Sequence, residues 1–247
     1  MNKLLYNYHT HTSRCGHATG LDEEYVVKAI ELGIKRLGFS DHIFFPNLSQ
    51  PRVRMDEDEV DDYLSSIHHL QEKYKNQIEI KVGFEVEYLP MFIDQYVDLL
   101  KTKKVDYLIL GQHFGQYDTT IKSYREDIMR YAYDVKAAVE LGVLTYIAHP
   151  DHFLLGKKEW DNECEQAARI IFETCEKTGT PLEINVLGIR YHRPYPSKDF
   201  FKLSKEYKLK YVLGIDAHNP NNFNQEDIDK AFAFIKELDI DIIDLKI

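Results

Sequence analysis

Two pairs of potential metal ligands are each separated by a single residue in this sequence. Residues 9–11 read His-Thr-His, and residues 216–218 read Asp-Ala-His. Each pair follows a short apolar run of the kind that forms a strand. The two side chains of a pair therefore point the same way, because side chains alternate along a strand with a period of two. Neutral imidazole and carboxylate groups suit zinc, iron or manganese. The pairs indicate a divalent-metal site, provided that the fold brings them to one face.

Further imidazoles and one more carboxylate follow other apolar runs. Seven of the eleven histidines, one Glu and one Asp fall just past predicted strand ends, at six separate places. Coincidence at six places is improbable. We therefore predict one metal site formed by His9, His11, His17, His42, Glu85, His113, His149, Asp216 and His218. Glu87, two residues beyond Glu85 on the same strand face, is an alternative to that carboxylate.

The remaining histidines are predicted to lie outside this site. His68 and His69 belong to a charged helical stretch and are expected to be exposed, whereas His152 and His192 lie in loops without a paired ligand. Cys15 lies between two candidate histidines, which makes it a possible ligand. We predict instead a small buried or loop thiol, because no second Cys lies within ligand spacing.

The elements that must position these residues alternate along the chain. Apolar runs bounded by polar turns predict seven strands, at 4–8, 36–39, 79–83, 106–110, 144–148, 181–184 and 211–214. Amphipathic patterns predict helices at 21–33, 56–74, 91–100, 124–141, 161–178, 197–207 and 225–238. A terminal apolar run at 240–245 is either a further strand or a closing segment.

This alternation implies parallel strands joined by crossover helices. Seven such units favour a closed α/β barrel over an open sheet, and barrel enzymes assemble their active sites at the C-terminal ends of the strands. No linker, low-complexity stretch or repeat of fixed period interrupts the chain. We therefore predict a single domain over residues 1–247.

Composition favours a small substrate over nucleic acid. The net charge is −10, and Lys and Arg are interspersed with Asp and Glu, whereas proteins that bind nucleic acid usually present a basic face. Three scattered cysteines do not form a disulfide framework. No signal peptide or apolar run of 18 residues is present, so we expect a cytoplasmic protein without a membrane partner.

Together the motifs resemble the PHP (polymerase and histidinol phosphatase) family of metal-dependent phosphoesterases. The matching segments, in the family's order, are 9–11 with His17, 38–42, 83–85, His113, 149–151 and 214–218. The resemblance implies a distorted (β/α)7 barrel with three divalent metal ions. One ion would be held by His9, His11, Glu85 and Asp216, a second by Glu85, His113 and His149, and a third by His17, His42 and His218. Asp41 and Asp151 resemble outer partners that orient imidazoles.

Within this family the chain is most similar to the histidinol-phosphatase type. The stretch 183–197 resembles the one in which those enzymes carry a phosphate-contacting arginine. This implies that Arg190 binds the substrate phosphate, with Arg193 and Arg14 as weaker alternatives, because a guanidinium can bind two phosphate oxygens at once. Such enzymes tend to carry another arginine shortly after the His-Pro-Asp motif. Here that run contains Lys157 and Lys158, and Lys157 is predicted to contact phosphate without the guanidinium fork.

The resemblance implies hydrolysis of a small phosphate monoester by a metal-activated water, with Glu85, Asp216 and His218 as catalytic residues. The leading substrate is L-histidinol phosphate, an intermediate of histidine biosynthesis. One alternative is a PHP enzyme that acts on phosphotyrosine protein or an oligonucleotide. Another is a barrel metallohydrolase that cleaves C–N or C–O bonds, although such enzymes typically bridge their metals with a lysine. The third is a non-catalytic metal-stabilised module, which a missing ligand would favour, but all nine are present. The sequence does not distinguish zinc, iron and manganese, and it indicates no oligomeric state.

Overall fold

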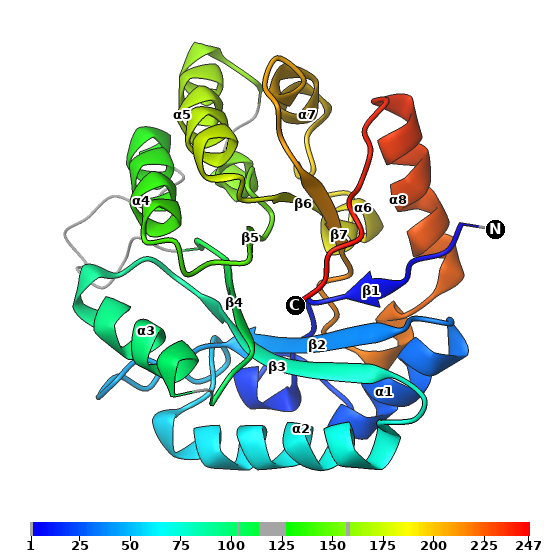
Figure 1. Ribbon diagram of the computed structural model, residues 1–247. Helices are drawn as coiled ribbons and strands as arrows, with labels where there is room; N and C mark the ends of the chain where they lie inside the picture. The colour runs from blue at the N-terminus through cyan, green and yellow to red at the C-terminus, as the bar shows by residue number, and fades with distance from the viewer. Residues whose placement is uncertain (1, 103, 114–126, 157–158) are drawn as a thin grey trace.

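Seven parallel strands form a single sheet in the order β1 to β7, with neighbours in sequence also neighbours in space. The computed structural model describes residues 2–102, 104–113, 127–156 and 159–247. The sheet curls around a central axis (Figure 1), and this confirms the predicted (β/α)7 barrel. The strands are β1 (Tyr6–Asn7), β2 (Arg36–His42), β3 (Glu79–Val86), β4 (Tyr107–Leu110), β5 (Tyr146–Ile147), β6 (Leu182–Asn185) and β7 (Tyr211–Gly214).

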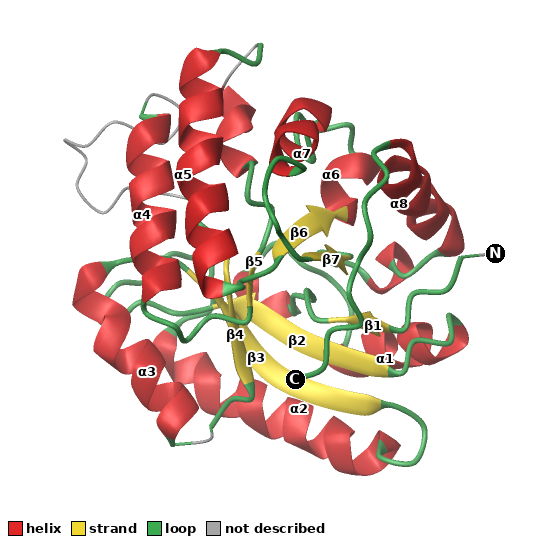
Figure 2. Ribbon diagram, turned by 45° about the horizontal axis from the view of Figure 1, so that its top comes forward, coloured by secondary structure: helices red, strands yellow, loops and turns green. Residues whose placement is uncertain are grey.

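The helices cover the outside of this barrel (Figure 2). They are α1 (Asp22–Glu31), α2 (Val60–Tyr74), α3 (Ile93–Lys101), α4 (Ile128–Glu140), α5 (Asn162–Thr178), α6 (Val186–Arg190), α7 (Lys198–Ser204) and α8 (Gln225–Glu237). All seven predicted helices are present, and the predicted start of α4 at residue 124 lies outside the described residues. The short helix α6 was not predicted. No helix in the described part of the chain combines the length and the apolar character needed to cross a membrane.

Capping residues explain where several helices begin. The side chains of Asp161, Ser197 and Asn224 accept hydrogen bonds from the backbone N–H groups of Cys164, Phe200 and Asp227, respectively. Each cap satisfies a donor that has no partner within its helix. The predicted starts of α5 and α7 therefore come one residue early, because the N-cap residue belongs to the helical sequence pattern but lies just outside the helix.

Strands β2 and β3 run further than predicted. They continue to His42 and Val86, and His42 pairs directly with Glu85 in the parallel register. The prediction that these two ligands lie past the strand ends is therefore wrong. The apolar pattern stops before the strand does, because side chains that face the open end of the barrel can be polar while the backbone ladder continues.

The gap between β1 and β7 is closed at both ends. On one side, Thr10 and Ala217 form an isolated parallel bridge, with the His11 N–H donating to the Ala217 carbonyl at 2.9 Å. At the opposite end, the C-terminal segment lies beside β7 through a parallel bridge between Tyr211 and Ile242. The predicted 240–245 run is thus a closing segment rather than a strand, and Figure 1 shows the C-terminus near the centre of the barrel.

Two apolar cores hold the barrel together. A large cluster fills the space between the strands and the surrounding helices. A smaller cluster includes Tyr6, Tyr8, Tyr107 and Tyr146, and the C-terminal segment 243–247 packs against it. Tyr6, Tyr107 and Tyr146 are the first residues of β1, β4 and β5, and the Tyr8 ring packs against those of Tyr6 and Tyr107, so this end of the barrel is filled. The C-terminal ends of the strands are left to hold polar side chains.

Candidate metal centre

The carboxylate of Glu85 lies at the centre of a histidine cluster. It is held on β3 and is almost completely buried. Its oxygens lie within 3.6 Å of nitrogens from five imidazoles: His149 at 2.9 Å, His42 at 3.0 Å, His11 at 3.5 Å, and His9 and His113 at 3.6 Å. Gly111 on the neighbouring chain segment leaves room for this carboxylate, because a Cβ there would come within 1.8 Å of Glu85 Oε1. The structure therefore brings five predicted ligands around the one predicted bridging group.

Asp216 provides a second carboxylate beside the first. Its Oδ1 lies 3.3 Å from both His11 Nε2 and His218 Nδ1, and 3.5 Å from His9 Nε2. The backbone of Asp216 has a φ of 53°, and that of His149 has a φ of 29°. Residues other than glycine seldom adopt such left-handed conformations, which concentrate at functional sites. Two of the predicted ligands are therefore held in strained backbone positions.

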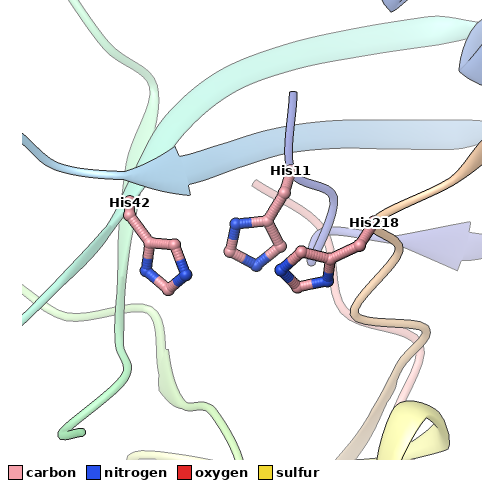
Figure 3. Close-up of side chains that lie close together, drawn as sticks. All are labelled: His11, His42 and His218. Carbon is pink, nitrogen blue, oxygen red and sulfur yellow. The ribbon is translucent and has the colours of Figure 1, made fainter. Parts of the chain in front are cut away.

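A third group of imidazoles lies beside Asp216. His17 Nδ1 lies 3.0 Å from the Cys15 carbonyl and His218 Nδ1 lies 3.3 Å from the Asp216 carbonyl, which favours a proton on each Nδ1. The two Nε2 atoms are then acceptors, yet they lie only 3.1 Å apart. Two facing lone pairs repel each other unless a cation or a proton lies between them. Figure 3 shows that the rings of His218, His42 and His11 gather from three separate segments.

Several buried ligand atoms lack a hydrogen-bond partner. Among the described residues these include His9 Nε2, Glu85 Oε2 and Asp216 Oδ1. Buried polar atoms are nearly always hydrogen-bonded, and an unsatisfied one needs an explanation such as an ion. The atoms left over are also the nitrogen and oxygen donors that divalent metals prefer. The donor set therefore fits a cluster of divalent metal ions.

Outer partners fix the orientation of the imidazoles. Glu183 on β6 lies 2.8 Å from His9 Nδ1 and accepts the backbone N–H of His149 at 2.9 Å. Asp41 lies 3.4 Å from His11 Nδ1, in the orienting position predicted for it. A carboxylate on one ring nitrogen leaves the other nitrogen free for a metal. Glu183 was not among the predicted site residues, although a carboxylate between Leu182 and Ile184 in an apolar strand was a signal for it.

The carboxylates divide the imidazoles into two groups by their pKa. Burial alone would lower the pKa of His9 and His11, but nearby Asp216 and other carboxylates raise both, that of His11 to about 9. Burial and the positive charge of His11 lower the pKa of His17 and His218 instead. The pKa is thus raised at the two imidazoles that lie beside both Glu85 and Asp216, and bound cations would supply the same positive charge there.

Asp151 and His152 differ from their predictions. Asp151 accepts the Ser197 N–H at 2.6 Å and has no hydrogen bond to an imidazole among the described residues, so the prediction that it orients a ligand is wrong. His152 was excluded, yet its ring lies 5.0 Å from the rings of His113 and His149 and lines the central cavity. The 3-10 helix His152–Gly156 that follows the His-Pro-Asp motif turns it inward, and no spacing in the sequence signals this.

Other residues lie as expected. His68 and His69 on α2 and His192 after α6 are exposed. Cys15 is fully buried, as predicted, and its thiol lies near His17 and His218, with ligand atoms of all three within 4.8 Å of one another. The alternative that Cys15 is a ligand therefore stays open.

A cavity of about 460 Å³ opens over the cluster, a size typical of sites for small molecules. Its lining comprises His11, His17, His42, Arg52, Val53, Arg54, Glu85, Glu87, His113, His149, His152, Leu187, Tyr191, Arg193, Tyr195, Asp216 and His218. His9 is fully buried and is absent from this lining. Eight of the nine predicted metal ligands therefore face a common space.

The predicted phosphate contacts are only partly brought to this cavity. Arg190 does not line it, because Nε donates to Asp227 at 2.6 Å and Nη2 donates to the Asn222 carbonyl at 2.9 Å, toward α8. This placement contradicts the prediction that Arg190 faces a substrate. Arg193 does line the cavity and donates to the Tyr195 hydroxyl at 2.6 Å. Lys157 and Lys158 lie outside the described residues.

A buried ion pair forms one wall of the cavity. Arg54 Nη2 donates to Glu87 Oε1 at 2.6 Å, and both side chains are almost completely buried. Glu87, the alternative to Glu85, lies beside the cluster with its Oε1 3.9 Å from His113 Nδ1. It therefore occupies the position of an outer partner rather than the centre. Nothing in the sequence spacing distinguished Arg54 from other loop arginines.

Comparison with known proteins agrees with this geometry. A probable histidinol-phosphatase of Deinococcus radiodurans is 27% identical over 233 residues, covering 87% of each chain. The histidinol-phosphatase of Bacillus subtilis is 24% identical over 247 residues, covering 85% of this chain and 92% of its own. The fold matches a crystal structure of histidinol phosphate phosphatase from Lactococcus lactis in complex with zinc, L-histidinol and phosphate. That match has a TM-score of 0.75 at 20% identity and covers 96% of this chain and 95% of the other. The model of the PHP domain matches residues 7–186, so the chain belongs to the PHP domain family.

Proposed function

We propose that this chain is a metal-dependent phosphatase that hydrolyses a small phosphate monoester, with L-histidinol phosphate as the substrate. The observation that carries the proposal is the set of buried ligand atoms without hydrogen-bond partners at the floor of a cavity for a small molecule. Such a cavity surrounds most of a small ligand, which favours a metabolite over a macromolecule.

We propose three divalent ions, of zinc, iron or manganese, shared among the nine ligands. His9, His11, Glu85 and Asp216 would hold one ion, and Glu85, His113 and His149 a second. His17, His42 and His218 would hold the third. Support comes from the short distances from Glu85 and Asp216 to these imidazoles and from the two Nε2 atoms that face each other 3.1 Å apart.

When bound, such ions supply a water nucleophile at neutral pH and offset the charge on a phosphoryl group. The chain's own residues orient the reacting groups. Glu183 and Asp41 hold His9 and His11 with their Nε2 atoms toward the cavity floor. Arg193, at the rim, can bind phosphoryl oxygens, and its bond to Tyr195 directs it. Glu85, Asp216 and His218 are the residues that we expect to be catalytic.

The relatives support this choice of substrate. The two curated relatives are named for histidinol phosphatase activity, and the similar structure was solved with L-histidinol and phosphate. L-histidinol phosphate is a small monoester, and the cavity of about 460 Å³ can accommodate a molecule of this size.

A phosphate-release assay tests the proposal. The chain is treated with a chelator, reloaded separately with zinc, manganese or iron(II), and its metal content is quantified. Release of inorganic phosphate is then compared for L-histidinol phosphate, a phosphotyrosine peptide and a 3′-phosphorylated oligonucleotide. We expect L-histidinol phosphate to give the highest kcat/KM by at least about tenfold, with activity lost on chelation.

Two results would argue against it. Preferential turnover of the peptide or the oligonucleotide would replace the substrate while keeping the phosphatase class. Absence of phosphate release from every ester, at a metal content of two or more ions per chain, would reject the phosphatase function itself.

A further inference from the structure

Three arginines line the cavity, although the chain as a whole is acidic. Arg52 and Arg54 come from the loop after β2, and Arg193 comes from the segment after α6. No described lysine lines the cavity. A substrate phosphate that needs cationic side chains from the described residues must therefore use these guanidinium groups.

Arg54 is not available for this purpose. Its Nη2 is paired with Glu87, its Nε donates to Gln50 Oε1 at 2.7 Å, and its Nη1 donates to the Ile43 carbonyl at 2.9 Å. The guanidinium also lies over the Phe45 ring at 3.6 Å. Because its charge is neutralised and each of its nitrogens donates a hydrogen bond, Arg54 anchors the loop rather than the ligand.

Arg52 lies on a turn that this anchor holds. The Val53 and Arg54 N–H groups both donate to the Gln50 carbonyl, at 3.0 and 3.2 Å. Arg52 lies inside the turn with a φ of 68°, a left-handed conformation that a residue with a long side chain seldom adopts. Its side chain is exposed and has no ion pair or hydrogen bond within the described part of the chain.

A close backbone contact places this turn against the metal centre. A Cβ on Gly16 would lie 2.7 Å from the N and Cα atoms of Arg52, so only glycine allows the two segments to approach in this way. Gly16 directly precedes His17, a proposed ligand of the third ion. Arg52 is thus held beside that ligand, at the rim of the cavity.

We propose that Arg52 is a second phosphate-binding guanidinium of this site, on the side of the cavity formed by His17. It contacts the phosphate monoester dianion together with Arg193, which approaches from the loops after β6. This inference rests on the proposed phosphatase function.

Direct binding of inorganic phosphate to the metal-loaded protein tests the inference. Isothermal titration calorimetry compares the unchanged chain with Arg52→Ala, Arg52→Lys and the matched control Arg130→Ala. Arg130 lies on α4 outside the cavity and its loss changes the net charge equally. We expect Arg52→Ala to weaken phosphate binding by about 10- to 100-fold, the usual range for loss of a charged hydrogen bond. Arg52→Lys should be intermediate, since it keeps the charge but not the fork, and Arg130→Ala should be unchanged.

Gly16→Ala provides a second test that substitutes no arginine. The new Cβ displaces the turn, so phosphate binding should weaken, and the comparison is made at equal metal content because Gly16 has a φ of 76° directly before His17. Equal phosphate affinity of Arg52→Ala and Arg130→Ala would overturn the inference. Loss of metal from Arg52→Ala would also overturn it, because the residue would then act through His17 rather than on the ligand.

The two proposals can fail separately. Phosphate binding that depends on Arg52, in a chain that does not hydrolyse L-histidinol phosphate, would reject the proposed substrate and support the role of Arg52. Hydrolysis with an unchanged KM in Arg52→Ala would reject the role of Arg52 alone.

Discussion

The two ends of the barrel interior use buried polar groups in opposite ways. At the N-terminal end two tyrosine hydroxyls donate within the protein, Tyr107 to the Tyr8 carbonyl and Tyr6 to the Ile243 carbonyl, both at 2.8 Å, whereas the Tyr8 hydroxyl is buried without a hydrogen-bond partner among the described residues. At the C-terminal end, His9 Nε2, Glu85 Oε2 and Asp216 Oδ1 are buried without hydrogen-bond partners. The first end is a closed core, whereas the second presents nitrogen and oxygen atoms that a metal ion can bind.

This difference separates stability from function along a single sheet. β4 begins at Tyr107 in the closed end and leads to His113 beside Glu85 at the open end, and Glu85 itself lies one residue before the last of β3. In barrels of this type the C-terminal face is where catalytic residues gather, and the opposite face serves stability. Substitutions at the two ends should therefore have separable effects on stability and on catalysis.

The largest effect is expected at the centre of the open end. Glu85→Gln removes a charge from the group shared by five imidazoles, so we expect kcat/KM for phosphate release to fall by about 10²- to 10³-fold, on the scale of losing one preorganised electrostatic contact. Metal content should fall in parallel. The barrel should still unfold cooperatively, because both apolar cores are intact. A variant that keeps full activity would contradict the catalytic role of the open end, since that end would then not need its central carboxylate.

The opposite result is expected at the closed end. Tyr107→Ala leaves a cavity in the inner core and should lower the free energy of unfolding by about 3–5 kcal/mol. Tyr107→Phe removes only the hydrogen bond to Tyr8 and should cost about 1 kcal/mol. Urea denaturation measures both. Metal content and kcat of the folded fraction should match the unchanged chain, and a specific loss of kcat in Tyr107→Phe would show that the two ends are coupled.

An intermediate effect on metal affinity is expected at Glu183, which lies behind the proposed metal ligands. Glu183→Gln keeps the shape of the side chain but weakens its hold on His9 Nδ1 and on the His149 N–H. Outer partners of this kind typically contribute 10- to 100-fold to metal affinity. We therefore expect metal dissociation constants to rise by about 10- to 100-fold, measured by competition with a chelator. Half-buried Glu165→Gln on α5, whose carboxylate pairs with Arg169, is the control and should leave metal affinity unchanged.

Much of this fold could be predicted because its signals are local. Apolar runs separated by amphipathic stretches indicated all seven strands, and β7 was predicted with its observed bounds. The ends of β2 and β3 could not be predicted, because His42 and Glu85 break the apolar pattern while their backbones remain in the ladder. The role of the 240–245 run depends on its contacts with β1 and β7, which no local pattern contains.

The residues of the site also divide into those that the sequence could predict and those that it could not. His9, His11, Asp216 and His218 could be found because their spacing after strands is regular. Arg52 could not, because its place beside the site depends on a contact with Gly16, 36 residues earlier in the chain. The sequence resemblance pointed to Arg190, but the structure pairs that guanidinium with Asp227 on α8. Whether a loop arginine reaches the cavity depends on tertiary contacts, and the spacing of residues along the sequence does not reveal them.

Asp151 differs from the other buried carboxyl groups discussed at the open end, because it does not belong to the set of metal ligands or their outer partners. Burial raises its pKa from 3.8 to about 7, despite the hydrogen bond from the Ser197 N–H. A carboxyl with a raised folded-state pKa favours folding fully below its unfolded pKa, and this contribution is lost as the pH rises from about 4 through 7. Asp151→Asn, which cannot ionise, should therefore stabilise the chelated protein at pH 8 by roughly 2 kcal/mol, about half of what the full shift would give.

The gain from Asp151→Asn should shrink toward zero near pH 4, where the unchanged chain already has this carboxyl protonated. Urea denaturation at pH 4, 6 and 8 measures the trend. A variant that is less stable than the unchanged chain at pH 8 would mean that the Asp151 charge is compensated there. The ionised Asp151 carboxylate would then stabilise the folded protein together with the other charged groups of the open end.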